Sequence, residues 1–147
     1  MSNYDSIIDG RVFESEPPVR VTREMILAFC EAVGEKNLRY QGDRDENSAD
    51  SAGIEAPLSF AAIFGDGENI FSQYPALNTR RLLAGIDLEF ISPIRAGDSI
   101  TTVSRIKEVY EKTGRSGPMV FIVISSILRK QNGEIAARLD YRYTNPL

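Results

Sequence analysis

From Arg81 to Tyr143, apolar and polar residues alternate with a period of two through four successive segments. The segments run over residues 81–93, 100–109, 119–128 and 135–143, and turn sequences rich in Gly, Asn, Asp and Pro separate them. A period of two places successive side chains on opposite faces of a strand. This half of the chain is therefore predicted to form four consecutive antiparallel strands. The third is an almost continuous β-branched run, typical of a central strand buried on both faces.

A single amphipathic helix is predicted between about Arg23 and Val33. Its apolar residues recur at the spacing of one buried helical face, at Ile26, Leu27, Phe29, Cys30 and Val33. Thr22 is a favourable N-cap, and Gly34 is well placed to end the helix. A short extended segment, Val19 to Val21, leads into it.

A second helix is predicted from Pro57 to about Phe71, with a possible break where Gly65 and Gly67 weaken it. Its first half is apolar on most sides, which is typical of a helix buried in a core. The expected architecture is a single α+β domain over residues 1–147, with a curved antiparallel sheet around a buried helix. Such a sheet has an open edge, which a second copy or a homologous partner would cover.

The composition excludes several kinds of function. The chain contains no histidine and a single cysteine, Cys30, so it lacks a Ser-His-Asp triad, a Cys-His pair, an imidazole metal site and an intrachain disulfide. Its formal net charge is −4 and its Lys and Arg residues are scattered, which argues against nucleic-acid binding. We therefore expect no metal and no nucleic-acid partner, and Cys30 is interpreted as a small buried apolar residue.

We expect a cytoplasmic protein without membrane association. Residues 1–10 lack a basic region followed by an apolar core, so they do not resemble a signal peptide. The longest apolar run, Met119 to Ile124, is far shorter than a bilayer-spanning helix.

Three segments carry a resemblance to a known family. They are Gly-Glu-Lys-Asn-Leu-Arg-Tyr at 34–40, Gly-Ile-Glu-Ala-Pro-Leu-Ser-Phe-Ala-Ala-Ile-Phe-Gly at 53–65 and Phe-Ile-Ser-Pro-Ile-Arg-Ala-Gly-Asp at 90–98. In this order they resemble the hot-dog fold of MaoC-like (R)-specific enoyl-thioester hydratases/dehydratases. The likeness is greatest to the degenerate N-terminal branch, which includes the non-catalytic subunit of mycobacterial-type (3R)-hydroxyacyl-ACP dehydratases. The resemblance implies a hot-dog fold and an activity, in fatty acid metabolism, that adds water to an enoyl thioester or removes it.

In the resembled family an Asp and a His, five residues apart, position the water and transfer the proton. The segment at 34–40 parallels the family's Gly-Asp-x-Asn-Pro-x-His, so Glu35 stands at the Asp position and Tyr40 at the His position, while Asn37 is retained. Glu is one methylene longer than Asp, and a misplacement of about 1 Å can cost about a hundredfold in rate. A phenol is a poor proton acceptor at neutral pH. Glu35, Asn37 and Tyr40 are therefore predicted to be an inactive remnant of the catalytic site.

The family also uses backbone N–H groups at the start of its central helix to polarise the thioester carbonyl. Pro57 stands at the position of the usual glycine and has no N–H. The residues Pro57, Leu58, Ser59 and Phe60 are predicted to border an acyl-binding channel. The alternative interpretation is that the apolar ones are ordinary core residues and that Ser59 is a routine helix-end residue.

The prediction is a catalytically deficient subunit that shapes the acyl pocket of an enoyl-CoA or enoyl-ACP hydratase, or of a 3-hydroxyacyl-thioester dehydratase. Its partner would be a catalytic MaoC-like hot-dog chain, and the hydro-lyase reaction requires no cofactor. Two alternatives remain open. One is a stand-alone enzyme, either a hydratase using Glu35 and Tyr40 or an acyl-CoA thioesterase using Asp66 or Glu68. The other is a homodimeric protein that binds acyl thioesters.

Overall fold

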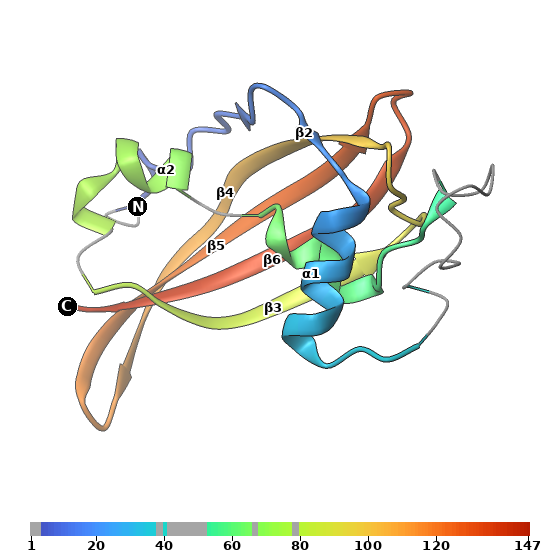
Figure 1. Cartoon of the computed structure of the whole chain (residues 1–147). Coiled ribbons are helices and arrows are strands. Elements are labelled where there is room, and N and C mark those ends of the chain that lie inside the picture. The colour runs from blue at the N-terminus through green and yellow to red at the C-terminus, as the bar shows by residue number, and fades with distance from the viewer. Residues whose placement is uncertain (1–3, 38–39, 41–52, 66–67, 78–79) are drawn as a thin grey trace.

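The computed structural model describes residues 4–37, 40, 53–65, 68–77 and 80–147. Figure 1 shows a long twisted sheet with the helices gathered against it. The elements, in chain order, are β1 (Phe13–Glu14), β2 (Val19–Arg20), α1 (Arg23–Val33), the 3-10 helix η3 (Leu58–Ile63), α2 (Glu68–Gln73), the 3-10 helix η4 (Pro75–Leu77), β3 (Leu82–Phe90), β4 (Ser99–Gly114), β5 (Gly117–Lys130) and β6 (Ile135–Pro146). The predicted α+β arrangement is confirmed.

Helix α1 begins and ends at the predicted residues. The hydroxyl of Thr22 accepts a hydrogen bond from the Met25 N–H, which satisfies one of the first-turn donors. Gly34 ends the helix in the left-handed conformation, with a φ of 73°, and its N–H donates back to the carbonyls of Cys30 and Glu31. A left-handed residue at this place favours glycine because it has no Cβ.

The described strands form one antiparallel sheet in the order β1-β4-β5-β6-β3, with β2 also paired to β4. The predicted central strand, β5, lies between β4 and β6. All four predicted strands are present, and β4 extends past Val109 to Gly114. Strand β3 pairs with β6 and not with β4, so the turn after β3 crosses the end of the sheet. In the described residues no strand lies beyond β3, and the predicted open edge is confirmed there.

The second predicted helix differs from the expectation. It is not one helix from 57 to 71 but the six-residue 3-10 helix η3, followed by the separate helix α2. Gly65 lies between them against the ring of Tyr141, whose hydroxyl donates to the Ala62 carbonyl. Glycine also has a poor helix propensity. Two side chains of η3, Leu58 and Ile63, are 47% and 46% exposed. This segment is therefore less buried than the prediction of a core helix implied.

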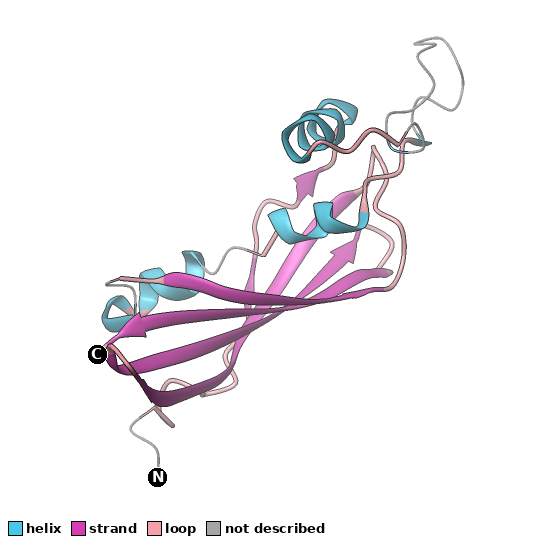
Figure 2. Ribbon diagram, turned by 90° about the horizontal axis from the view of Figure 1, so that it is seen from below, coloured by secondary structure: helices cyan, strands magenta, loops and turns pink. Residues whose placement is uncertain are grey.

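The core lies between the sheet and the helices. Figure 2 shows the helices on one face of the sheet, with η3 nearer to the strands than α1. Phe60 of η3 joins the layers, because its ring meets Phe29 of α1 and Phe64 edge-on at 5.4 and 5.5 Å between centroids. In β6 the odd-numbered residues from Ala137 to Asn145 face this core. Every helix in the described residues falls short of the length and apolar character that crossing a bilayer requires.

One lysine joins the chain segments at the end of the sheet where β5 turns into β6. The Lys130 ammonium donates to the Pro93 carbonyl and lies 3.7 Å from Asp98 and 3.8 Å from Glu134. Its side chain is only 9% exposed. The β3–β4 connection, which contains Pro93 and Asp98, and the β5–β6 turn, which contains Glu134, therefore meet at a single cation.

Candidate functional site

The segment that resembles the catalytic motif is a tight loop after α1. The Glu35 N–H donates to the Cys30 carbonyl at 2.8 Å, which continues the C-terminal cap of the helix. The Glu35 carboxylate then accepts a hydrogen bond of 2.9 Å from the Asn37 N–H, two residues further on. Glu35 is half-buried and Asn37 is exposed. One carboxylate oxygen of Glu35 therefore stabilises the loop that contains it.

Tyr40 closes this loop against the core. Its N–H donates to the Asn37 carbonyl at 3.1 Å, and its ring packs, half-buried, against the hydrophobic core. The Cys30 thiol points at the Tyr40 carbonyl, with the sulfur 3.9 Å from the oxygen. Leu38 and Arg39, between Asn37 and Tyr40, lie outside the described residues.

Cys30 is buried beneath the loop, as predicted. Its side chain is 2% exposed. Burial raises the pKa of the thiol, and the negative charge of Glu35 raises it further. Both causes keep the sulfur neutral at physiological pH, which suits a core residue and not a nucleophile.

A hollow of about 290 Å³ opens beside the loop. It is lined by Leu27, Cys30, Glu31, Gly34, Glu35 and Lys36. The residues of the motif thus border an open surface and not a closed chamber. Among the described side chains, no three acidic or cysteine residues gather closely enough to hold a metal ion.

The start of η3 is the second part of the candidate site. Pro57 is the N-cap residue, with φ −57° and ψ 153°, and no side chain caps this end. The N–H just before it, on Ala56, donates to the Ile94 carbonyl at 2.8 Å, which ties the chain to the turn after β3. Leu58 and Ser59 come next, in the turn where helical N–H groups lack an acceptor within the helix. Pro57 therefore supplies no N–H at this end of η3, where the N–H groups of Leu58 and Ser59 remain as donors.

The four predicted acyl-channel residues divide into two pairs. Pro57 and Phe60 are buried, and the ring of Phe60 packs against two other aromatic rings in the core. Leu58 and Ser59 are exposed at the surface of η3. The core interpretation therefore fits Phe60, whereas Leu58 and Ser59 are accessible to a ligand or to a second chain.

Polar side chains lie in the interior along β4 and β5. The Ser104 and Ser126 hydroxyls are 2.7 Å apart, and the Thr102 hydroxyl donates to the Phe64 carbonyl at 3.2 Å. A cavity between β1, β4 and α2, lined in part by Thr102 and Ser104, has a volume of about 30 Å³. A cavity of this size holds a water molecule. An acyl chain would not fit at this place.

The described carboxylate of the thioesterase alternative lies on α2 and not on η3. Asp66 lies outside the described residues, and Glu68 is the first residue of α2. Helix α2 itself belongs to the other end of the sheet, where the Phe71 ring meets Tyr143 edge-on at 5.1 Å.

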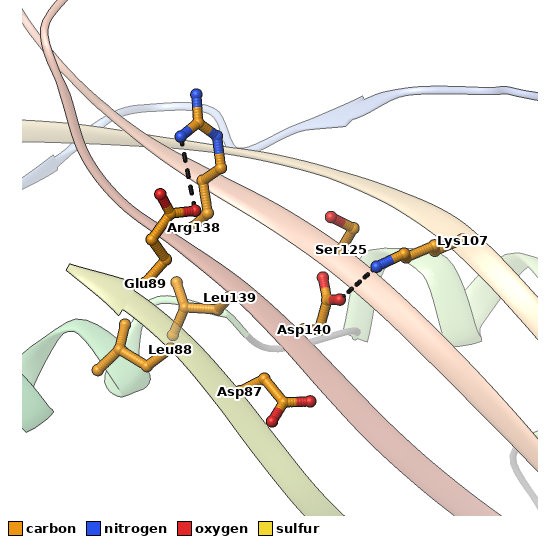
Figure 3. A pocket seen from close by; sticks show the side chains of 8 residues that line it. All are labelled: Asp87, Leu88, Glu89, Lys107, Ser125, Arg138, Leu139 and Asp140. Atoms are coloured by element: carbon orange, nitrogen blue, oxygen red, sulfur yellow. Dashed lines mark hydrogen bonds and ion pairs between the residues drawn. The ribbon is translucent and has the colours of Figure 1, made fainter. Parts of the chain in front are cut away.

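A charged groove on the opposite face of the sheet was not singled out from the sequence. Its volume is about 430 Å³, and Figure 3 shows the side chains that line it: Asp87, Leu88, Glu89, Lys107, Ser125, Arg138, Leu139 and Asp140. Lys107 donates to Asp140 at 2.6 Å, and Arg138 lies 3.7 Å from Glu89. In the sequence these residues are the polar members of the alternating pattern in β3 and β6. Such residues are indistinguishable from ordinary solvent-facing residues of a strand.

The sequence matches a known family and several curated relatives. The profile of a family described as FAS1-like, dehydratase domain region, matches residues 8–139. A UPF0336 protein from Streptomyces griseus is 29% identical over 114 residues, covering 75% of this chain and 76% of that protein. A UPF0336 protein from Streptomyces avermitilis is 30% identical, with the same coverage.

Solved structures share the fold at low sequence identity. A chain of the HadBC (3R-hydroxyacyl-ACP dehydratase) complex from Mycobacterium tuberculosis has a TM-score of 0.72 at 18% identity, covering 92% of this chain and 95% of that chain. A chain of the ChsH1-ChsH2 complex from the same organism also reaches 0.72 at 18%, covering 97% and 92%. A MaoC-like dehydratase reaches 0.75 at 20%, covering 93% of this chain and 42% of that chain. The chain has the hot-dog fold of these proteins, and it belongs to the family of FAS1-like dehydratase domain regions.

Proposed function

We propose that this chain is a catalytically deficient subunit of an (R)-specific hydratase or dehydratase acting on acyl-CoA or acyl-ACP thioesters. The hydratase direction adds the H and OH of one water across the double bond of a 2-enoyl thioester, giving a 3-hydroxyacyl thioester. This reaction consumes no cofactor. A second hot-dog chain with an intact Asp and His would perform it.

The observation that carries the proposal is the loop between α1 and Tyr40. In the resembled family the residue at the position of Glu35 works on water together with a histidine. Here one oxygen of the Glu35 carboxylate accepts the Asn37 N–H, and the histidine position holds Tyr40, a ring packed against the core. A general base must reach the proton that it removes and have a suitable pKa. The hydrogen bond of Glu35 and the identity of Tyr40 both point to a structural loop.

The start of η3 supports the same division of labour. Pro57 cannot donate to a thioester oxygen, and the neighbouring Ala56 N–H is already bonded to Ile94. The exposed Leu58 and Ser59 would instead form one wall of an acyl pocket that a partner completes.

The experiment compares this chain alone, a catalytic hot-dog partner alone, and the two co-expressed. Hydration is followed by the loss of the enoyl-thioester absorbance, with acyl chains of several lengths on both CoA and ACP. The expected result is no turnover for this chain alone and restored turnover, with an altered chain-length preference, for the pair. Robust hydration by this chain alone, abolished by Glu35→Ala, would overturn the proposal.

A further inference from the structure

Strand β4 has a stretch of backbone whose outer side is not covered by any described strand. The short strands β2 and β1 cover β4 only between Ser99 and Ser104. Over residues 105–114 the described chain pairs with β4 on its inner side alone, through β5. Figure 1 shows this stretch leading into the β4–β5 turn, at the end of the sheet away from β2. Its outward N–H and C=O groups can therefore pair with another strand.

Three side chains of this stretch stand in a row on the face opposite the helices. Tyr110 pairs with Phe121, and the two rings stack with 5.1 Å between centroids and 3° between planes. Glu108 precedes Tyr110 by two residues and Lys112 follows it by two, so all three share one face. The Lys112 ammonium lies over both rings, 5.5 and 5.9 Å from their centroids. Val109 points to the other face and is 6% exposed. The row thus presents a carboxylate, an aromatic ring and an ammonium in turn.

The order of this row makes it complementary to itself. Residues directly opposite in an antiparallel pair lie on the same face of the sheet. When two copies pair about Tyr110, Glu108 of each copy faces Lys112 of the other, and the two Tyr110 rings face each other. Opposite charges and aromatic rings so placed stabilise a strand pair. Because a two-fold interface repeats every contact, both ion pairs form together.

The neighbouring registers lack this match. Pairing about Val109 sets Glu108 opposite Tyr110, which leaves the carboxylate without an ammonium across the interface. Pairing about Glu111 sets that residue against itself, and like charges directly opposite each other are destabilising. The side chains of the row therefore select the register about Tyr110.

The other charges near this stretch were included in the comparison. In the register about Tyr110 the two Glu111 side chains are diagonal neighbours on the face of Val109. Diagonal neighbours are about 7–8 Å apart, against about 5 Å for opposite residues, so this one repulsion is weaker than two direct attractions. The Glu111 carboxylate also accepts the Tyr4 hydroxyl at 2.6 Å. Lys107 lies in the bulge that ends regular pairing, and its ammonium donates to Asp140.

We propose that residues 108–112 of β4 pair antiparallel with the same residues of a second copy of this chain, about a two-fold axis at Tyr110. The backbone edge supplies the hydrogen bonds, and the row of Glu108, Tyr110 and Lys112 selects the partner and the register. The paired stretch is short, so the association is weak and depends on protein concentration. It does not rest on the proposed function, because it uses neither part of the candidate site.

The test exchanges the two charges of the row. Glu108→Lys and Lys112→Glu each place like charges opposite each other in a self-pair, whereas Glu108→Lys/Lys112→Glu restores opposite charges. Sedimentation equilibrium gives the dissociation constant of each protein and of the equimolar mixture of the two single variants. We expect each single variant to associate about tenfold more weakly than wild type. The double variant and the mixture should recover the association, because every Lys in the pair again faces a Glu.

Amide exchange locates the contact, and a matched variant controls for net charge. Exchange across residues 108–112 should slow as the wild-type concentration rises. Glu31→Lys carries the same charge change as Glu108→Lys on an exposed residue of α1, and it should associate like wild type. Circular dichroism verifies that every variant is folded.

Four results would overturn the proposal. They are no association of wild type, single variants that associate like wild type, no recovery in the double variant or the mixture, and unchanged exchange at residues 108–112. Association through any other surface gives the second and fourth results. Each outcome leaves the co-expression test of hydration untouched, and failure of that test leaves this one intact.

Discussion

Gly65 lies directly against the ring of Tyr141, so closely that a Cβ on Gly65 would overlap the ring atoms. The contact joins the end of η3 to the middle of β6, and the Tyr141 hydroxyl donates to the Ala62 carbonyl beside it, at 2.8 Å. Gly65→Ala would force apart two elements of a packed core. We expect it to lower the free energy of unfolding by about 1–3 kcal/mol or more, measured by urea denaturation. Gly53→Ala is the control, because a Cβ on Gly53 meets no atom within 4 Å; equal effects of the two substitutions would contradict the contact.

The buried thiol of Cys30 gives a pH dependence with a definite sign. Its pKa is raised by burial and by the charge of Glu35, so the folded state holds the thiol proton more tightly than the unfolded chain does. This contribution to stability is complete below the ordinary thiol pKa of about 8.5 and is lost as the pH rises through and above it. We expect the stability difference between wild type and Cys30→Ala to shrink between about pH 7 and pH 10. Parallel pH profiles for the two proteins would refute this.

The buried pair Ser104 and Ser126 suits a double-mutant cycle. Their hydroxyls are 2.7 Å apart, and both side chains are buried. Removing one hydroxyl leaves the other without this partner, which costs about 1–3 kcal/mol, whereas removing both can be nearly neutral. Ser104→Ala/Ser126→Ala should therefore be less destabilising than the sum of the two single changes, as judged by urea denaturation. Additive effects would show that the two hydroxyls are not coupled.

Glu35 is predicted to act on the loop and not on substrate. Glu35→Ala removes the acceptor of the Asn37 N–H and should cost up to about 1 kcal/mol of stability, since the bond is exposed. Glu35→Gln retains a carbonyl acceptor and should cost less. Turnover by the complex with a catalytic partner should be the same for both variants and wild type. A similar loss of turnover in both variants, each of which lacks the carboxylate charge, would assign Glu35 to the chemistry.

Restoring the family's motif should restore part of the missing activity. Glu35→Asp/Tyr40→His rebuilds the acid and the base, and a positioned general base typically contributes about 10²–10⁴-fold. Adding Pro57→Gly returns a backbone donor at the start of η3 and should raise turnover further. The measurement is enoyl-thioester hydration by the purified chain, with Pro57→Gly alone as the control. Activity in that control without the other two changes would point to a different catalytic group.

Local patterns predicted the strands and α1 well, because their causes are local. Thr22 and Gly34 end α1 by hydrogen bonds within a few residues, and alternation alone places the apolar side of β6 on the core. The length of the second helix was not predictable in this way. It depends on the approach of Gly65 to Tyr141, a contact across 76 residues, and on the burial of Phe60 by a ring from α1.

The candidate site was predicted in part. The motif residues form one loop, and Cys30 is buried, but the sequence did not show that Glu35 bonds to its own loop. That bond depends on the backbone turn at Asn37 and has no signature in residue type. The groove beside β3 was also missed, since its charges come from three strands that the topology brings together.

The contacts of Lys130 have a consequence for how the sheet opens. Its ammonium contacts the Pro93 carbonyl and Asp98 of the β3–β4 connection and Glu134 of the β5–β6 turn, so the two connections share one cation. Local opening of either connection exposes the cation on which the other connection also depends. This end of the sheet should therefore exchange its amide hydrogens as one cooperative unit, and acetylation of the Lys130 ammonium would loosen both connections together.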